Sequence, residues 1–184
     1  MGINKKLVKE YLFEPFKALK NVKNLTYCAM LLALSVLSAY IMSFYPTNYI
    51  KISITFIFIA IIAMKFGPAI AGIVAAAADI IQCVTHPVGP YQPLLTVGAA
   101  LSGIIFGVLL YHNKTNLWRI IVSKATISLF ISSLFDTYAI SLLYGIPFVS
   151  FFIPRIIKNA IAFPIEVFLI VTVISLVKKL DKKI

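Results

Sequence analysis

Residues 52–84, ISITFIFIAIIAMKFGPAIAGIVAAAADIIQCV, decide the fold, because they are apolar almost throughout and are interrupted once in the middle. The interruption reads Lys65-Phe66-Gly67-Pro68. Glycine permits an unusual backbone conformation there, and proline suits the first turn of a new helix. The pattern predicts two short membrane-crossing helices, 52–64 and 68–84, joined by a tight turn. The alternative is one long buried hairpin with a re-entrant piece.

The apolar character extends along the rest of the chain. Of its 184 residues, 61% are hydrophobic and only 12% are charged. A soluble domain of this length cannot bury that much apolar surface, so most of the chain must face lipid. The net charge of +11 would suggest nucleic acid in a soluble protein, but basic segments held against an anionic inner leaflet explain it here. A nucleic-acid partner is therefore rejected.

Six apolar stretches can be compared with the roughly 20 residues that a spanning helix needs. They are 25–45, 52–64, 68–84, 93–111, 117–144 and 152–177. The sequence therefore predicts an all-α integral membrane protein of six transmembrane helices, with residues 25–184 forming one membrane domain. Residues 1–24 alternate lysines with apolar residues at helical spacing. This favours a short basic amphipathic segment on the inner membrane surface, with a disordered basic tail as the alternative.

Basic residues predict the orientation. Six crossings bring most of the 17 lysines and arginines to one side, including Lys124 near the start of the fifth stretch. By the positive-inside rule this side is cytoplasmic and holds both termini. Only Lys51, Arg155 and Lys158 fall toward the outside. Charges in or beside hydrocarbon are costly and are usually retained for function, so these three are candidate binding residues.

The last stretch opens with PRIIKN at 154–159. Proline suits a first helical turn, and the exposed amino end of a helix attracts anions. Arg155, Lys158 and Asn159 share one helix face, on which arginine can grip a carboxylate bidentately and lysine adds a mobile charge. With Lys51 they predict an anion-binding site open to the outside. Two cations that merely snorkel to the interface are the alternative.

Acidic and amide side chains are predicted at the same outer end. Asp79, Gln82 and His86 are spaced so that they share one helix face. A carboxylate beside an amide can bind a heterocycle that presents N–H donors. Internal ion pairing of Asp79 or Asp136 with one of the outer cations is the competing hypothesis. Glu166 lies deeper and is expected to pair with a cation or to cap a polar network.

The outer loop HPVGPYQP at 86–93 contains three prolines, which make it a stiff wall or lid. Within it, Tyr91 can stack on a flat ring and Gln92 can hydrogen-bond the edge of that ring.

Small residues recur on two of the predicted spans. Ala29 and Ala33 lie one helical turn apart and form a flat strip on which another helix can dock closely. A second set, which includes Gly103 and Gly107, is expected to serve internal packing.

Motifs for catalysis are absent from the sequence. It has no H-E-x-x-H, no aspartate-rich pair, no Walker A loop and no paired cysteines. A membrane enzyme of lipid chemistry usually needs a metal site or a nucleophile motif. The sequence therefore predicts a protein that is not an enzyme and has no metal or cofactor, although such an enzyme stays the distant alternative.

The order of several short motifs resembles one known membrane family. FGP at 66–68 precedes ADII at 78–81, GPY at 89–91 and AALSGIIFG at 99–107, and PRIIKN is followed by PIE at 164–166. This order resembles the folate-specific S components of energy-coupling factor (ECF) vitamin transporters. The resemblance implies a six-helix substrate-binding subunit of a bacterial cell membrane. It would work with a transmembrane coupling subunit and two cytoplasmic ATPases on other chains, and Ala29 and Ala33 match the docking surface of such subunits.

The ligand that the resemblance implies agrees with the predicted site. Folate carries two carboxylates on its glutamate tail, which suit Arg155 and Lys158. Its flat rings suit Tyr91, and its pterin edge suits the amide and carboxylate groups: Asp79, Gln82, Gln92 or Asn159. Another vitamin, such as pantothenate or riboflavin, is the alternative ligand.

Overall fold

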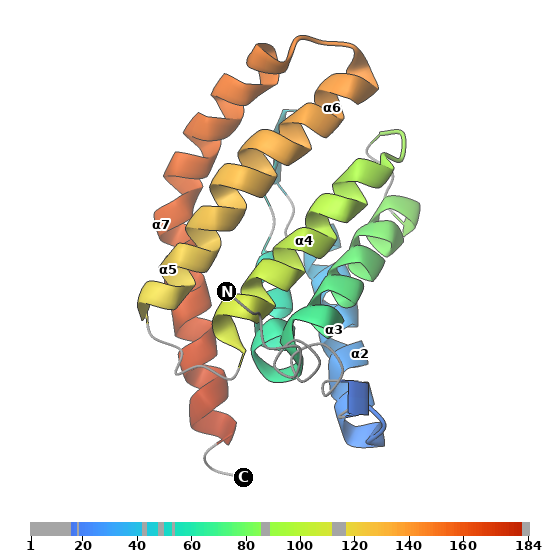
Figure 1. Ribbon diagram of the computed structural model, residues 1–184, viewed down its shortest axis with the longest axis vertical. Helices are drawn as coiled ribbons and strands as arrows, with labels where there is room; N and C mark the ends of the chain where they lie inside the picture. The colour runs from blue at the N-terminus through green and yellow to red at the C-terminus, as the bar shows by residue number, and fades with distance from the viewer. Residues whose placement is uncertain are drawn as a thin grey trace, which may run out of the picture.

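The computed structural model describes residues 16–17, 19–41, 44–47, 50–52, 54–85, 89–111 and 117–181, arranged as in Figure 1. The elements in chain order are α2 (Val22–Ile41), β1 (Phe44–Thr47), β2 (Ile50–Ile52), α3 (Thr55–Thr85), α4 (Pro93–Leu110), α5 (Leu117–Thr126), the π-helix η1 (Ile127–Phe135), α6 (Asp136–Tyr144) and α7 (Phe148–Asp181). Most of the amphipathic segment predicted at 1–24 lies outside the described residues.

In the described part of the chain, five helical segments are long and apolar enough to cross a membrane. They are α2, α3, α4, the continuous run Leu117–Tyr144 and α7 as far as Lys179. Large apolar side chains such as Leu37, Ile104 and Phe168 are exposed on their outer faces, as helices in contact with lipid require. The predicted class, a helical integral membrane protein, is confirmed.

A short hairpin follows α2. Strands β1 and β2 pair antiparallel, with Phe44 opposite Ile52 and Thr47 opposite Ile50. The sequence prediction carried the first span to residue 45, but α2 ends at Ile41 and the chain then becomes extended. The apolar pattern missed this boundary because Phe44 and Tyr45, the first two strand residues, are aromatic and extend the apolar stretch beyond the end of α2.

The helix α3 is broken at Gly67, where φ is 78° and ψ is −179°. This backbone region is essentially restricted to glycine. Pro68 follows as the first residue of the second arm, where its missing N–H costs nothing. Phe56 and Ala78 would lie about 33 Å apart on a straight helix at about 1.5 Å per residue. Both line the same cavity, so the second arm folds back along the first, as the sequence predicted for 65–68.

Close packing of α4 on α3 depends on two glycines of α4. A Cβ atom at Gly107 would collide with Pro68, and one at Gly103 would collide with the backbone of Ala71. The two helices therefore approach closely and antiparallel beside the turn. Around this contact the buried core contains Ile62, Phe106 and other apolar residues of α3 and α4. The predicted internal packing role of Gly103 and Gly107 is confirmed.

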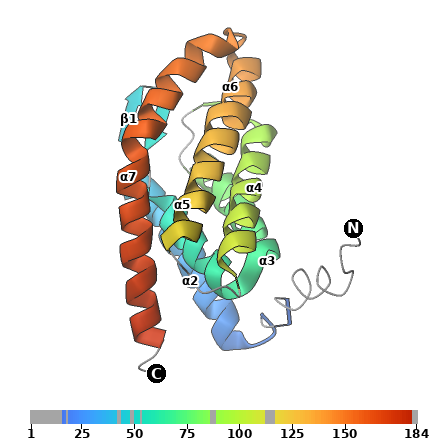
Figure 2. The same ribbon diagram turned by 60° about the vertical axis from the view of Figure 1, so that its left-hand side comes forward.

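The connections gather at two ends of the molecule. In Figure 1, the β1–β2 hairpin, the ends of α3 and α6 and the starts of α4 and α7 lie toward the upper end. The start of α2, the middle of α3, the end of α4, the start of α5 and the end of α7 lie toward the lower end. Figure 2 shows α7 running alongside α5, η1 and α6, with which it makes contacts.

A nine-residue π-helix, η1, interrupts the run between α5 and α6. The backbone N–H of Asp136 donates to the carbonyl of Ile131, five residues earlier, and the hydroxyl of Ser133 donates to the carbonyl of Ser128 at 2.8 Å. π-Helices are rare and often occur at functional sites, because the wider turn re-aims the side chains that follow. The sequence prediction missed this feature.

Candidate functional site

A cavity of about 470 Å³ lies toward the end of the bundle at which α3 and α6 end and α4 begins. Its walls come from both arms of α3, the segment 89–92, α4, η1, α6 and α7. Pockets for small molecules typically fall between about 300 and 1,000 Å³, so this cavity is of ligand size. Among the residues predicted for the site, the lining includes Asp79, Gln82, Tyr91, Gln92, Arg155 and Lys158.

Two cations of α7 reach the cavity. Arg155 and Lys158 are half-buried and lie about one helical turn apart, so both face the same wall. Nη1 of Arg155 donates to the carbonyl of Ser132 on η1 at 3.1 Å, which holds the guanidinium against the neighbouring helix. The expectation that Pro154 begins this helix is wrong, because α7 begins at Phe148. The amino end of the helix is therefore several residues away from Arg155.

The carboxylate of Asp79 is held by a relay of hydroxyl groups. Thr96 donates to Oδ2 of Asp79 at 2.8 Å. The hydroxyl of Tyr91 lies 3.0 Å from that of Thr96, and it must be the donor because the Thr96 proton is already directed to Asp79. The relay connects Tyr91, which is 49% exposed at the mouth of the cavity, to the half-buried Asp79 on the second arm of α3. Thr96 has no place in the sequence prediction.

Asp136 places a second carboxylate in the cavity wall, at the junction of η1 and α6. It shares this lining with Arg155, Asp79 and Lys158. A Cβ atom at Gly98 would lie 2.6 Å from Oδ1 of Asp136, so glycine leaves the space that this carboxylate occupies. Asp136 therefore lies in the same cavity as the cations of α7, and its ion pairing with one of them stays a prediction.

The two glutamines differ in their surroundings. Nε2 of Gln92 donates to the carbonyl of Ala139 on α6 at 3.2 Å, which ties the segment 89–92 to the opposite wall. Gln82 lies on the second arm of α3 and is half-buried in the lining. Tyr144 at the end of α6 approaches the same segment, because a Cβ atom at Gly89 would lie 2.8 Å from its hydroxyl.

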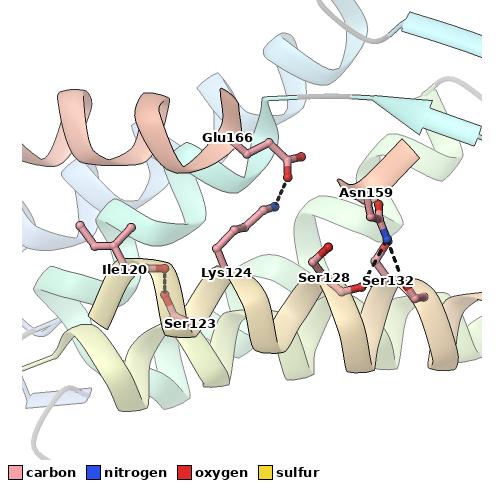
Figure 3. A network of polar contacts seen from close by, with 8 residues as sticks. Ile120, Ser123, Lys124, Ser128, Ser132, Asn159 and Glu166 are labelled. Atoms are coloured by element: carbon pink, nitrogen blue, oxygen red, sulfur yellow. Dashed lines mark hydrogen bonds and ion pairs between the residues drawn. The ribbon is translucent and has the colours of Figure 1, made fainter. Parts of the chain in front are cut away.

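Asn159 is buried between α7 and η1 and is absent from the cavity lining (Figure 3). Its Nδ2 lies within hydrogen-bond distance of Oγ of Ser133 at 2.9 Å, Oγ of Ser132 at 3.2 Å and the carbonyl of Ser128 at 3.3 Å. These contacts link α7 to the π-helix. The sequence grouped Asn159 with Arg155 and Lys158 on one helix face, but its side chain turns to the serines of η1, and its role as a ligand contact stays a prediction.

Two further candidates cannot be placed in the cavity. Lys51 belongs to β2, which directly precedes the first arm of α3, but the structure describes only its backbone. His86 lies outside the described residues. The small-residue strip is described: Ala29 and Ala33 are exposed on α2, next to the exposed side chains of Met30 and Leu37.

One charged pair was only half anticipated. The expectation that Glu166 pairs with a cation is confirmed, and that cation is Lys124, whose Nζ lies 3.0 Å from Oε2 of Glu166. Lys124 was expected among the basic residues of the cytoplasmic end; it is buried inside the bundle, only 7% exposed. No sequence signal separates a lysine that packs inside from one that faces water.

In the described ranges, no three His, Cys, Asp or Glu residues are placed to hold a metal ion.

A ligand-sized, charged cavity near one end of an apolar helical bundle defines a membrane-embedded binding protein. Residues 23–174 match the family described as ECF transporter, substrate-specific component, and the chain belongs to this family. The resemblance found in the sequence is confirmed. The protein is therefore a transporter component rather than an enzyme, and a multi-pass membrane protein of bacteria.

More particular similarities point to one branch of the family. The folate transporter FolT of Clostridium novyi is 30% identical over 163 residues, which cover 89% of this chain and 94% of the relative. The folate transporter FolT of Leuconostoc mesenteroides is 29% identical over 127 residues, which cover 66% and 69% of the two chains. The crystal structure of a FolT bound with folic acid is similar with a TM-score of 0.76 and 32% identity, covering 82% of this chain and 92% of that chain.

The contacts of Asn159 predict a structural effect. Replacing Asn159 by leucine removes the donor shared by three serines and leaves buried polar groups unsatisfied, which costs about 1–3 kcal/mol of stability. Thermal unfolding of the detergent-solubilised variant should show this loss. Thr172→Ala, on the exposed face of the same helix, is the matched control and should change stability by less than about 0.5 kcal/mol. A leucine variant as stable as wild type would contradict the packing role.

Proposed function

We propose that this protein is the folate-binding subunit of an ECF-type importer, which captures folate from outside the cell. The observation that carries the proposal is the pair of cations, Arg155 and Lys158, in the wall of a ligand-sized cavity. The similarity to proteins named folate transporter FolT, and to a FolT solved with folic acid, supports the same ligand.

The chemistry of the cavity fits the parts of folate. The glutamate tail carries two carboxylates, and a guanidinium grips a carboxylate through two parallel hydrogen bonds. Tyr91 stands at the mouth, where it can contact a flat ring. Asp79, Gln82 and Gln92 offer acceptors and donors for the pterin edge. Lys51, His86 and Asn159 stay predictions as ligand contacts.

A charge-preserving series tests the site. Arg155→Ala should weaken folate binding by about 1.5–3 kcal/mol, because a charged hydrogen bond is lost, whereas Arg155→Lys should lose less. Calorimetric titration of purified protein with folate measures both. Arg119→Ala, which removes an arginine from α5 outside the cavity lining, is the control and should bind as wild type does. Unchanged affinity in a folded Arg155→Ala protein removes this residue from the site.

The same titration separates the alternative ligands. Folate should bind far more tightly than pantothenate or riboflavin, since only folate combines two carboxylates with extended flat rings. Tighter binding of either other vitamin would reassign the subunit within its family, while binding of none of the three would refute the proposal.

We propose further that the protein crosses the membrane six times, with both termini in the cytoplasm. The break at Gly67 supports this count, because the two arms of α3 then cross as separate helices. The distribution of charge along α7 supports the orientation, since Lys178 and Lys179 lie in its last turn, whereas its cavity-lining residues come earlier in the helix.

Thiol labelling tests the orientation. In a protein whose Cys28 and Cys83 are replaced by alanine, single cysteines are introduced at Val149, at the start of α7, and at Lys178, near its end. Both positions are exposed. An impermeant maleimide added to intact cells should label position 149 and reach position 178 only after permeabilisation. The reverse pattern would invert the topology and place the cavity on the cytoplasmic side.

The importer also requires other chains. We propose that a transmembrane coupling subunit and two cytoplasmic ATPases supply the energy, and that Ala29 and Ala33 form the docking strip. Small, exposed side chains one turn apart allow a partner helix to approach closely.

Bulky substitutions test the strip. Ala29→Trp or Ala33→Trp should abolish folate uptake by cells that hold the whole transporter, because tryptophan blocks close helix contact, while the purified variants still bind folate. Val108→Trp places the same side chain on the exposed face of α4 and should leave uptake intact. Loss of folate binding in the alanine variants would instead indicate a role in internal packing.

A further inference from the structure

A buried ion pair joins α5 to α7 beside the cavity (Figure 3). Nζ of Lys124 lies 3.0 Å from Oε2 of Glu166, and the two side chains are only 8% and 17% exposed. The same Nζ lies 4.3 Å from the centre of the Phe56 ring, on the first arm of α3. A buried ion pair is weak evidence for stability, since apolar residues of similar volume often replace it at no loss. The position of this pair therefore suggests a further role.

Only one partner of the ion pair, Glu166, lines the cavity. Glu166 and Phe56 line the cavity, whereas Lys124 lies behind them, outside the lining. The charged side chains of the described lining are three carboxylates and two cations: Asp79, Asp136, Glu166, Arg155 and Lys158. On its own this lining has an excess of negative charge, which opposes the entry of an anion. Lys124, which lies outside the lining, supplies a positive charge that balances this excess.

Glu166 also acts on one of the proposed binding cations. Both side chains line the same cavity, so the charge of Glu166 bears on Lys158 as well. Lys158 and Glu166 lie on the same helix, so Glu166 has a cation on its own helix and another on α5. The short contact with Lys124 directs the Glu166 carboxylate toward α5. If Lys124 lost its charge, the negative charge of Glu166 would no longer be balanced. It would then attract Lys158 and repel a bound anion.

We propose that Lys124 is a specificity-determining positioning residue: it neutralises Glu166 from behind the cavity wall and so keeps the cavity suited to a ligand with carboxylates. This inference rests on the proposed function, because it concerns the anionic character of the ligand. Lys124 thus influences which ligands bind, although it does not line the cavity.

Charge variants of the pair test the inference. Lys124→Met keeps the length of the side chain but leaves an uncompensated carboxylate, and should weaken folate binding about tenfold or more. Glu166→Gln removes one negative charge and should tighten folate binding about threefold. The double variant Lys124→Met/Glu166→Gln restores neutrality and should bind within about threefold of wild type. A purely structural ion pair would instead make both single variants weaker.

A second ligand isolates the electrostatic effect. Pteroate lacks the glutamate of folate with its two carboxylates and carries one free benzoate carboxylate instead. It therefore has one negative charge fewer than folate, and Lys124→Met should weaken pteroate binding less than folate binding. Equal losses for the two ligands would indicate a general distortion of the cavity and would overturn the inference. Calorimetric titration of wild type and the three variants with both ligands gives the comparison, after size-exclusion chromatography has shown that each variant is monodisperse.

The remaining outcomes also decide the question. If Lys124→Met does not fold, the other two variants suffice: weaker folate binding by Glu166→Gln, or a loss above about tenfold in the double variant, overturns the inference. Wild-type affinity in folded Lys124→Met overturns it as well while leaving the proposed function intact. Failure of the wild-type protein to bind folate refutes the proposed function itself.

Discussion

The backbone conformation of Gly67 is the constraint on which the rest of the structure depends. With φ at 78° and ψ at −179°, this residue allows α3 to reverse within a single turn, and Pro68 begins the second arm without an unsatisfied N–H. Within a bilayer every backbone polar group needs an internal partner, which disfavours a long irregular loop. A reversal at a single residue leaves fewer backbone groups unpaired. The glycines of α4 then bring that helix against the turn.

This reversal also makes the cavity. Folding α3 back places Phe56 of the first arm near Ala78 and Asp79 of the second, and these residues form part of one wall. The opposite wall comes from α7 and from η1, whose wider turn leads directly into Asp136. Apolar helices that surround a polar cavity are what a membrane protein needs in order to hold a charged nutrient within hydrocarbon.

Several polar and charged side chains at the cavity are held in place by hydrogen bonds to neutral groups. Asp79 accepts from Thr96, Arg155 donates to a carbonyl of η1, and Asn159 ties the same π-helix to α7. Such contacts restrain the side chains before a ligand arrives, which reduces the ordering that binding would otherwise require. Lys124 adds a compensating charge at the far side of Glu166.

Much of the fold could be read from local patterns. Long apolar stretches predicted helices at most of the observed positions, and Gly67-Pro68 predicted the turn within α3. The hairpin after α2, the early start of α7 at Phe148 and the π-helix were missed, because apolar content alone does not distinguish a strand, a helix and a π-helix. Proline at 154 is tolerated inside α7, so its usual meaning as a helix start misled the prediction.

The sequence by itself determined the class of protein, the apolar segments and the presence of cations where a membrane protein normally avoids them. These properties depend on composition and on short-range periodicity, which lipid and helix geometry translate directly into structure. Only the tertiary structure decided which polar groups meet: that Arg155 and Lys158 face the cavity, that Asn159 turns to the serines of η1, and that Lys124 pairs with Glu166. Such pairings join residues far apart in the chain, and the packing of one helix face against another determines them.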